Sequence, residues 1–196
     1  MNLPNKLTIF RIILVPIMVI IPFLGIQGEI LGIPITYIII NIIFIIASIT
    51  DKLDGYLARK WNQVTTFGKF ADPLADKILV LGAMMMLVEF DKLPAWIPIV
   101  VIAREFIVSG YRLIAVEKGG KVIAASIWGK LKTATQMVAI VLAFIDTKPF
   151  GAFISQGLEG FGLGLNIVST VIMLISVVAT IFSGYDYLKN GKELFK

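Results

Sequence analysis

The chain contains neither cysteine nor histidine among its 196 residues. The lack of cysteine excludes a disulfide framework and a cysteine-ligated metal site. The lack of histidine removes the usual general base near neutral pH and the commonest protein ligand for metals. Any acid–base or metal chemistry must therefore rest on aspartate, glutamate, lysine or tyrosine.

Charged residues are also scarce: only 16% of the chain is Asp, Glu, Lys or Arg, whereas 58% is hydrophobic. Soluble domains are typically about 25% charged and about 45–50% apolar. The length leaves room for a single transmembrane catalytic domain, residues 1–196, of roughly six spans. No internal repeat, low-complexity segment or linker in the sequence indicates a second domain.

Apolar runs predict an all-α integral membrane protein with six transmembrane helices, at about 7–26, 34–59, 72–91, 94–118, 128–147 and 163–189. The first run follows a basic residue, as a secretory signal does, but no A-x-A-like cleavage site follows it and five further spans do. Pro73 would lie in the first turn of the third helix, where its missing N–H is tolerated.

The basic residues predict the orientation, because cytoplasmic segments of membrane proteins carry an excess of lysine and arginine. With the N-terminus inside, 16 of the 18 basic residues fall on the cytoplasmic side, and only Lys92 and Lys148 fall outside. The three tryptophans lie near predicted helix ends, as interfacial residues do. We therefore expect both termini to be cytoplasmic.

Four of the seven aspartates lie within residues 50–77, a polar stretch between two apolar runs. Asp51 and Asp54 are three residues apart and therefore share one helix face. Asp72 and Asp76, four residues apart, share a face of the next helix. Two adjacent helices can thus direct four carboxylates at one point. Such a cluster would repel itself unless cations neutralise it, and an all-oxygen ligand set suits Mg²⁺ or Mn²⁺.

Basic residues within the predicted spans form a second set. Arg104 and Arg112 interrupt the fourth predicted helix, and Lys130 and Lys132 begin the fifth. Ionisable groups at membrane depth usually face a partner or a wet cavity, so one polar cavity open to the cytoplasm would explain both sets. Divalent cations with Arg and Lys are what phosphoryl transfer requires, and an aspartate is the natural base where histidine is lacking.

The acidic stretch has the spacing of a known signature. Asp51-x-x-Asp54-Gly55-x-x-Ala58-Arg59, then eight residues, then Gly68-x-x-x-Asp72-x-x-x-Asp76 resembles the signature of the CDP-alcohol phosphatidyltransferases in residue type and spacing. Three flanking stretches are similar to the bacterial phosphatidylglycerophosphate synthase branch of this family: "PNKLTIFRIILVP" near the start, "AREFIVSGYR" at 103–112 and "GKLKT" at 129–133. Only these flanking stretches indicate which acceptor is used.

The resemblance implies a six-helix fold in the bacterial cytoplasmic membrane, usually homodimeric, with the active site facing the cytoplasm. It implies two divalent cations, Mg²⁺ or Mn²⁺, as cofactors bound by Asp51, Asp54, Asp72 and Asp76. Asp76 would also be the catalytic general base. The CDP pocket would be lined by Gly55, Ala58, Arg59 and Gly68, with Arg59 on the diphosphate.

The implied reaction transfers the phosphatidyl group of CDP-diacylglycerol to sn-glycerol 3-phosphate, giving phosphatidylglycerophosphate and CMP, with no nucleic acid as partner. The candidates for binding the acceptor's phosphate are Arg104, Arg112, Lys130 and Lys132. Asn5 and Thr8 are expected to border the nucleotide or headgroup. Arg11 either lies with them or is an interfacial anchor whose charge extends to the membrane surface.

Three alternatives have different sequence signatures. Other acceptors in the same family are serine, inositol phosphate and phosphatidylglycerol, although a phosphate-bearing acceptor suits four extra basic residues better than serine does. A membrane prenyltransferase would carry two separated Asp-rich motifs on a longer bundle, whereas these four acids fall within 26 residues. A divalent-cation transporter would distribute acids over several spans, whereas the other spans offer weak polar groups such as Asn41 and Gln136.

Overall fold

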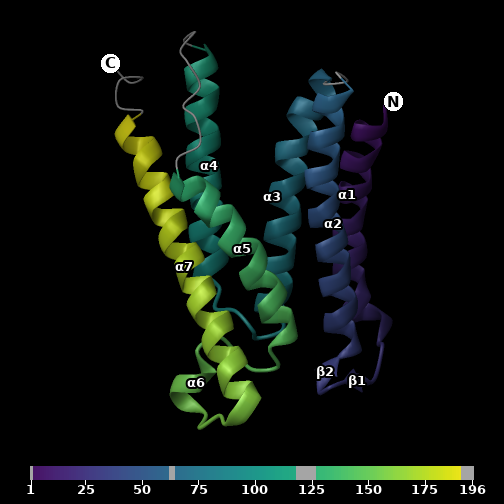
Figure 1. The fold of residues 1–196 in the computed structure, drawn as a ribbon, viewed down its shortest axis with the longest axis vertical. Helices are drawn as coiled ribbons and strands as arrows, with labels where there is room; N and C mark the ends of the chain where they lie inside the picture. The colour runs from purple at the N-terminus through teal and green to yellow at the C-terminus, as the bar shows by residue number, and fades with distance from the viewer. Residues whose placement is uncertain (1, 62–64, 118–126, 191–196) are drawn as a thin grey trace.

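The computed structural model describes residues 2–61, 65–117 and 127–190, and this part of the chain is almost entirely helical (Figure 1). Its long helices are α1 (Leu3–Ile20), α2 (Ile35–Lys60), α3 (Thr66–Glu89), α4 (Trp96–Glu117), α5 (Ile127–Ile145) and α7 (Gly160–Asn190). The smaller elements are the 3-10 helix η1 (Ile21–Leu24), the strands β1 (Glu29–Ile30) and β2 (Ile33–Pro34), and the single-turn helix α6 (Ala152–Ser155).

The predicted helices are all present, and the largest differences in where they start are at α3 and α1, which begin six and four residues earlier than predicted. The hydroxyl of Thr65 caps α3 by accepting a hydrogen bond from the Gly68 N–H at 3.0 Å, so the helix starts at Thr66. Pro73 therefore lies inside α3, not in its first turn, and removes one backbone hydrogen bond there. Asn2 caps α1 in the same way, which moves its start to Leu3.

The link between α1 and α2 contains an antiparallel hairpin that the sequence analysis did not predict. Ile30 pairs with Ile33, so the turn consists of Leu31 and Gly32. Both have positive φ angles, +54° and +76°, as a two-residue hairpin turn of type I′ requires. Glycine adopts this conformation freely, whereas leucine rarely does. A Leu-Gly pair is therefore not a recognisable signal for this turn in the sequence.

Within the described residues, three segments are long and apolar enough to cross a membrane: Leu3–Leu24, Ile35–Leu57 and Gly160–Lys189. The helices α3, α4 and α5 have 24, 22 and 19 residues. At about 1.5 Å per residue they are about 28–36 Å long, close to the roughly 30 Å of a hydrocarbon core. Their charged ends therefore need polar surroundings if these helices also span the bilayer.

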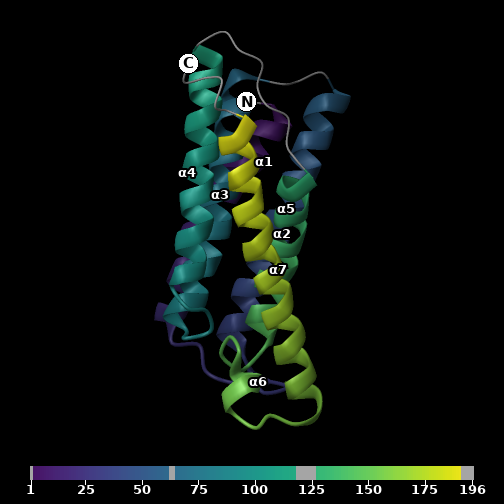
Figure 2. The same ribbon diagram turned by 90° about the vertical axis from the view of Figure 1, so that its left-hand side faces the viewer.

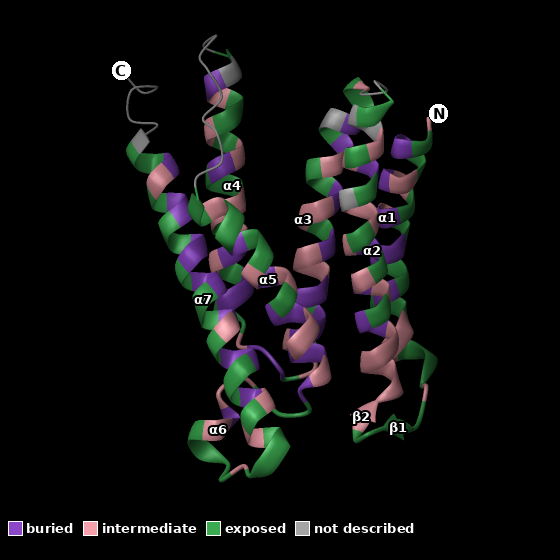
Figure 3. Cartoon of the chain, in the orientation of Figure 1, coloured by how far each residue is buried: buried purple, intermediate pink, exposed green. Residues whose placement is uncertain are grey.

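The helices form two groups that separate toward one end in Figure 1 and overlap in the view of Figure 2, which is turned by 90°. In one group α1 packs on α2 and α3, and in the other α7 packs on α5 and α4. The apolar core, which includes Phe44, Leu87, Phe144 and Met173, lies in the half nearer the hairpin and α6. In the other half, where α1 begins and α7 ends, buried and exposed residues alternate around a more open arrangement (Figure 3).

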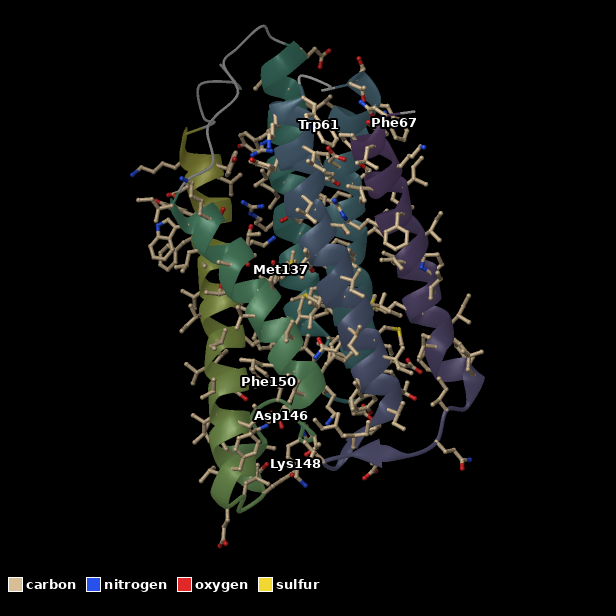
Figure 4. The ribbon with its side chains drawn as sticks, turned by 45° about the vertical axis from the view of Figure 1, so that its right-hand side comes forward. Trp61, Phe67, Met137, Asp146, Lys148 and Phe150 are labelled. Carbon is tan, nitrogen blue, oxygen red and sulfur yellow. The ribbon has the colours of Figure 1, made fainter. Side chains whose placement is uncertain are left out.

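A buried polar cluster joins the loops at the core end, where Figure 4 labels Asp146 and Lys148. Asn166 of α7 is fully buried; its amide donates to Asp146 Oδ2 at 2.8 Å and to the Pro149 carbonyl at 2.9 Å. Lys92, from the α3–α4 loop, donates to the Asp146 carbonyl at 3.0 Å. Burial lowers the pKa of Lys92, and the Asp146 carboxylate opposes that effect.

We predict that Asn166→Ala lowers the thermal stability of the detergent-purified protein. It would remove the hydrogen bonds that Asn166 makes with Asp146 Oδ2, the Pro149 carbonyl and the Phe153 N–H. The Pro149 carbonyl keeps the Ala152 N–H, so the cost of about 1–3 kcal/mol for a buried group left unpaired applies to Asp146 Oδ2 and the Phe153 N–H. The matched control is Asn41→Ala, which removes a single hydrogen bond to the Val141 carbonyl. Equal melting temperatures for the two variants would contradict the prediction.

Candidate active site

The four signature aspartates lie where the end of α2 meets the beginning of α3. Asp51 and Asp54 lie in the last turns of α2, and Asp72 and Asp76 lie in the first half of α3. Their spacings of three and four residues place each pair on one helix face, as the sequence predicts. Asp54 is buried, with 2% of its side chain exposed, whereas Asp51 and Asp76 keep 29% and 39%.

The helix α1 supplies the partners of all four acids. Arg11 is fully buried, and its Nη1 lies 2.9 Å from Asp51 Oδ1 and 2.7 Å from Asp76 Oδ1. Its Nη2 donates to Asp54 Oδ2. One turn earlier, the hydroxyl of Thr8 donates to Asp72 Oδ1 at 2.5 Å. Arg11 is thus not an interfacial anchor, because its charge lies inside the acidic cluster.

The carboxylates fit a hard divalent cation in their chemistry, but they are arranged around a guanidinium. Oxygen ligands from four carboxylates are what Mg²⁺ and Mn²⁺ bind. In the described part of the chain, no three acidic side chains form a ready-made metal site. Three of them share the Arg11 guanidinium instead, which shows that they can gather around one centre of positive charge.

Gly68 lets α3 approach α1 closely. A Cβ at this position would lie 3.2 Å from Asn5 Oδ1, 3.3 Å from Thr65 Oγ1 and 3.7 Å from Asp72 Oδ2. The Thr65 hydroxyl also donates to Asn5 Oδ1 at 2.9 Å, so Asn5 holds the capped start of α3. A larger residue at position 68 would therefore force Asn5 or Thr65 to shift, whereas Asp72 is at ordinary van der Waals distance.

The remaining predicted CDP-binding residues are less fully described. Gly55 is half-buried and directly follows Asp54 in α2. Ala58 and Arg59 belong to the last turns of α2, and their side chains lie outside the described part of the structure. The predicted contact of Arg59 with the diphosphate therefore stays a prediction.

A cavity of about 620 Å³ lies between α3, α4 and α5. It connects the two sets of charged residues, because Asp51 and Asp76 line it together with several basic side chains. Its charged and polar lining is Asp51, Asp76, Lys77, Arg104, Glu105, Ser109, Arg112, Lys132, Thr133, Gln136 and Tyr187. Farther along the helices the wall becomes apolar, with residues such as Leu81, Val101 and Met137, the last of which is labelled in Figure 4.

Glu105 holds the basic side chains of this cavity together. Its Oε1 accepts from Lys132 at 2.5 Å and from Arg104 at 2.9 Å, and its Oε2 lies 3.7 Å from Lys77 Nζ. Lys132 is buried, with 9% of its side chain exposed. A buried lysine without such a carboxylate would be costly, so Glu105 compensates the charges that surround it.

Arg112 of α4 lines the cavity and contacts Tyr187 of α7. Its Nη2 donates to the Tyr187 hydroxyl at 2.9 Å, and the guanidinium groups of Arg112 and Arg104 lie 5.7 and 5.8 Å from the Tyr187 ring centre. Tyr187 is itself buried. The aromatic ring thus orients two of the predicted phosphate-binding residues.

The structure brings together three of the four predicted phosphate-binding residues, Arg104, Arg112 and Lys132. The fourth, Lys130, is exposed on α5 and does not line this cavity. Sequence reasoning had not assigned Lys77, Glu105 or Tyr187 to the site. Lys77 and Glu105 each carried a usable signal, because each directly follows a residue already assigned to the site.

Comparison with known proteins assigns the chain to a family. Residues 1–182 match the CDP-alcohol phosphatidyltransferase family. The chain belongs to this family. The resemblance to this family is therefore confirmed over nearly the full length of the chain.

Three similar proteins are each named CDP-diacylglycerol–glycerol-3-phosphate 3-phosphatidyltransferase. The Bacillus subtilis protein is 43% identical over 202 residues, which cover 100% of this chain and 97% of the relative. The Haemophilus influenzae protein is 38% identical and covers 97% of this chain and 94% of itself. The Rickettsia typhi protein is 37% identical, with 99% of both chains covered.

We predict that Glu105 and Lys132 of this phosphatidyltransferase are energetically coupled. Glu105→Gln and Lys132→Met should each destabilise the protein, because each leaves a buried charge without its closest partner. The double variant should lose less than the sum of the two, by about 0.5–3 kcal/mol, in unfolding measurements in detergent. The control combines Glu105→Gln with Lys60→Met at an exposed position of α2. The losses of stability from these two substitutions should add. Additivity in the first pair would contradict the coupling.

Proposed function

We propose that this chain transfers the phosphatidyl group of CDP-diacylglycerol to sn-glycerol 3-phosphate, releasing phosphatidylglycerophosphate and CMP. The observation that supports this most strongly is the shared cavity, in which Asp51 and Asp76 face Arg104, Arg112 and Lys132. A site for a phosphate-bearing acceptor needs such a basic set next to its catalytic acids. The names of the full-length relatives point to the same pair of substrates.

In the proposed reaction the C1 hydroxyl of the acceptor attacks the phosphorus that carries diacylglycerol. A new P–O bond forms to the acceptor, the P–O bond to CMP breaks, and Asp76 accepts the proton of the hydroxyl. Asp76 suits this role because it is part-exposed and lines the cavity next to Lys77. No histidine in the sequence competes for the role of base.

Two divalent cations, Mg²⁺ or Mn²⁺, bound by Asp51, Asp54, Asp72 and Asp76, would supply charge neutralisation of the diphosphate and of the departing CMP. Gly55, Ala58, Arg59 and Gly68 would border the cytidine and diphosphate, as the signature implies. Asn5 and Thr8 would keep the start of α3 in position, since they hold Thr65 and Asp72.

On the acceptor side, Arg104, Arg112 and Lys132 would bind the phosphate of glycerol 3-phosphate, and Lys77 would add to their charge. Arginine offers fixed, paired N–H donors for phosphate, and lysine adds a compact charge. Lys130 would attract the acceptor to the entrance, since it is exposed close to Lys132 in sequence. Serine, which lacks a phosphate, would offer these cations no phosphate oxygens to bind.

We further propose that all six long helices cross a bacterial cytoplasmic membrane, with both termini and the site on the cytoplasmic side. The basic residues of the signature stretch and of α4 and α5 support this orientation by the positive-inside rule. The cavity would provide the polar surroundings that the charged ends of α3, α4 and α5 require. Exposed apolar residues of α7, such as Val171 and Val178, would face lipid or the second subunit of a homodimer.

The decisive experiment measures CMP release from CDP-diacylglycerol by the detergent-purified protein. Glycerol 3-phosphate, serine, inositol phosphate and phosphatidylglycerol are added one at a time, with Mg²⁺, Mn²⁺ or EDTA. We expect release only with glycerol 3-phosphate and a divalent cation, and none from Asp76→Asn. Release with another acceptor would contradict the proposed substrate, and release in EDTA would contradict the role of metals.

We predict that Arg112→Ala raises the KM for glycerol 3-phosphate about tenfold or more while changing the KM for CDP-diacylglycerol little. A lost charged hydrogen bond to phosphate is worth about 1.5–3 kcal/mol, and about 1.4 kcal/mol corresponds to tenfold. Initial-rate kinetics with each substrate varied in turn provide the measurement. The control is Lys189→Ala. It removes an exposed cation from the last turn of α7, two residues after Tyr187, to which Arg112 donates. Unchanged acceptor KM in Arg112→Ala would assign that residue to structure.

A further inference from the structure

Arg11 is fully buried among three carboxylates, and the proposed reaction gives it no role. Arg11 lies in the middle of α1, a largely apolar helix. None of the Arg11 side chain is exposed. Its two terminal nitrogens contact three carboxylates from two other helices. Among the described groups its Nε is buried and has no hydrogen-bond partner.

The charge of Arg11 is permanent. A guanidinium does not lose its proton in a protein, so it cannot escape burial by becoming neutral. Its three contacts therefore tie the acids to α1, and the acids in turn make the buried cation tolerable. Removing the guanidinium would leave four close carboxylates that repel one another.

The oxygens that Arg11 contacts belong to residues that would bind the divalent cations. Asp51 Oδ1, Asp54 Oδ2 and Asp76 Oδ1 each accept from or pair with its terminal nitrogens. An oxygen lone pair directed at an N–H is not available to a metal ion, and a positive charge at this point repels a second one. Guanidinium and metal therefore compete for one place.

We propose that Arg11 is the built-in counter-cation of the acidic cluster, which a divalent cation must displace when it binds. This inference rests on the proposed metal binding by the four aspartates. Two divalent cations balance four carboxylates, so displacement leaves the charge of Arg11 free for an anionic group nearby. The diphosphate of the nucleotide lipid has that chemistry.

The displacement does not require α1 itself to move. Thr8 donates to Asp72, and Asn5 accepts from Thr65, so two contacts outside the guanidinium hold this helix against α3. The arginine side chain has several rotatable bonds and can turn while its Cα stays in place. Arg11 is thus a positioning residue whose side chain can leave the acidic cluster while α1 stays packed against α3.

The experiment measures Mn²⁺ binding by the loss of the free-ion electron paramagnetic resonance signal, without nucleotide or acceptor. The full chain is reconstituted in nanodiscs of zwitterionic lipid, so that the lipid adds no cation-binding charge. We expect Arg11→Met to bind Mn²⁺ about tenfold tighter than the unaltered chain, because a competing buried charge is removed. We expect Arg11→Lys to lie between the two, since it keeps the charge on a different geometry.

Two controls separate this effect from general ones. Lys6→Met removes an exposed cation from the same helix, and its Mn²⁺ affinity should stay unchanged. Asp54→Asn should weaken binding at least about tenfold, which identifies the acidic cluster as the site. In a thermal melt, Mn²⁺ should raise the melting temperature of Arg11→Met more than that of the unaltered chain.

The possible failures are distinguishable. If the unaltered chain binds Mn²⁺ and Asp54→Asn does not, unchanged or weaker binding by folded Arg11→Met and Arg11→Lys overturns the inference and leaves the proposed metal site intact. If neither the unaltered chain nor the Arg11 variants bind Mn²⁺, the proposed metal site itself is overturned, and this inference with it. If Arg11→Met is folded only in the presence of Mn²⁺, the exchange of guanidinium for metal is supported.

Discussion

Charges buried between helices must be neutralised where they lie, and this requirement determines the arrangement of the charged end of the molecule. Asp54 is buried, so it needs a cation that is buried as well. Arg11 meets the need from α1, and the same helix reaches the fourth acid through Thr8. The close contact of α1 with α2 and α3 is therefore part of the acidic site and not only of the hydrophobic core.

The basic side of the cavity follows the same rule with the signs reversed. There Glu105 is the one acid among Lys77, Arg104 and Lys132. Among the described side chains, each half of the site thus contains a residue of the opposite charge, which compensates that half before any substrate is present. In the metal exchange proposed for Arg11, an incoming divalent cation would replace one counter-charge of the carboxylates by another, so that the acids would be compensated both before and after binding.

Local rules predicted the part of this site that depends on spacing within one helix. The intervals between Asp51 and Asp54, and between Asp72 and Asp76, fix which faces they share whatever the rest of the chain does. The same rule could have separated Lys130 from Lys132, because residues two apart on a helix point to nearly opposite sides. Lys132 is buried and Lys130 is exposed, as that rule requires.

The partners across helices could not be predicted in this way. Arg11 meets Asp54 and Asp76 over separations of 43 and 65 residues, and no local pattern encodes such a pairing. The apolar sequence around Arg11 left two possibilities equally open, a place at the border of the nucleotide or headgroup and an interfacial anchor. The start of α3 was mispredicted for a different reason: Pro73 is a strong helix-start signal, but the cap at Thr65 determines the real one.

The two halves of the site meet on consecutive residues of α3. Asp76 contacts Arg11, and Lys77 donates to Ser109 and lies beside Glu105. Neighbouring residues on a helix point about 100° apart, so one helix can form the wall of both halves only at a fixed rotation. Contacts with α1 hold α3 at its rotation: Thr65 donates to Asn5, and Thr8 donates to Asp72, one turn before Asp76. These two contacts thereby help to set how the proposed base faces the acceptor-binding residues.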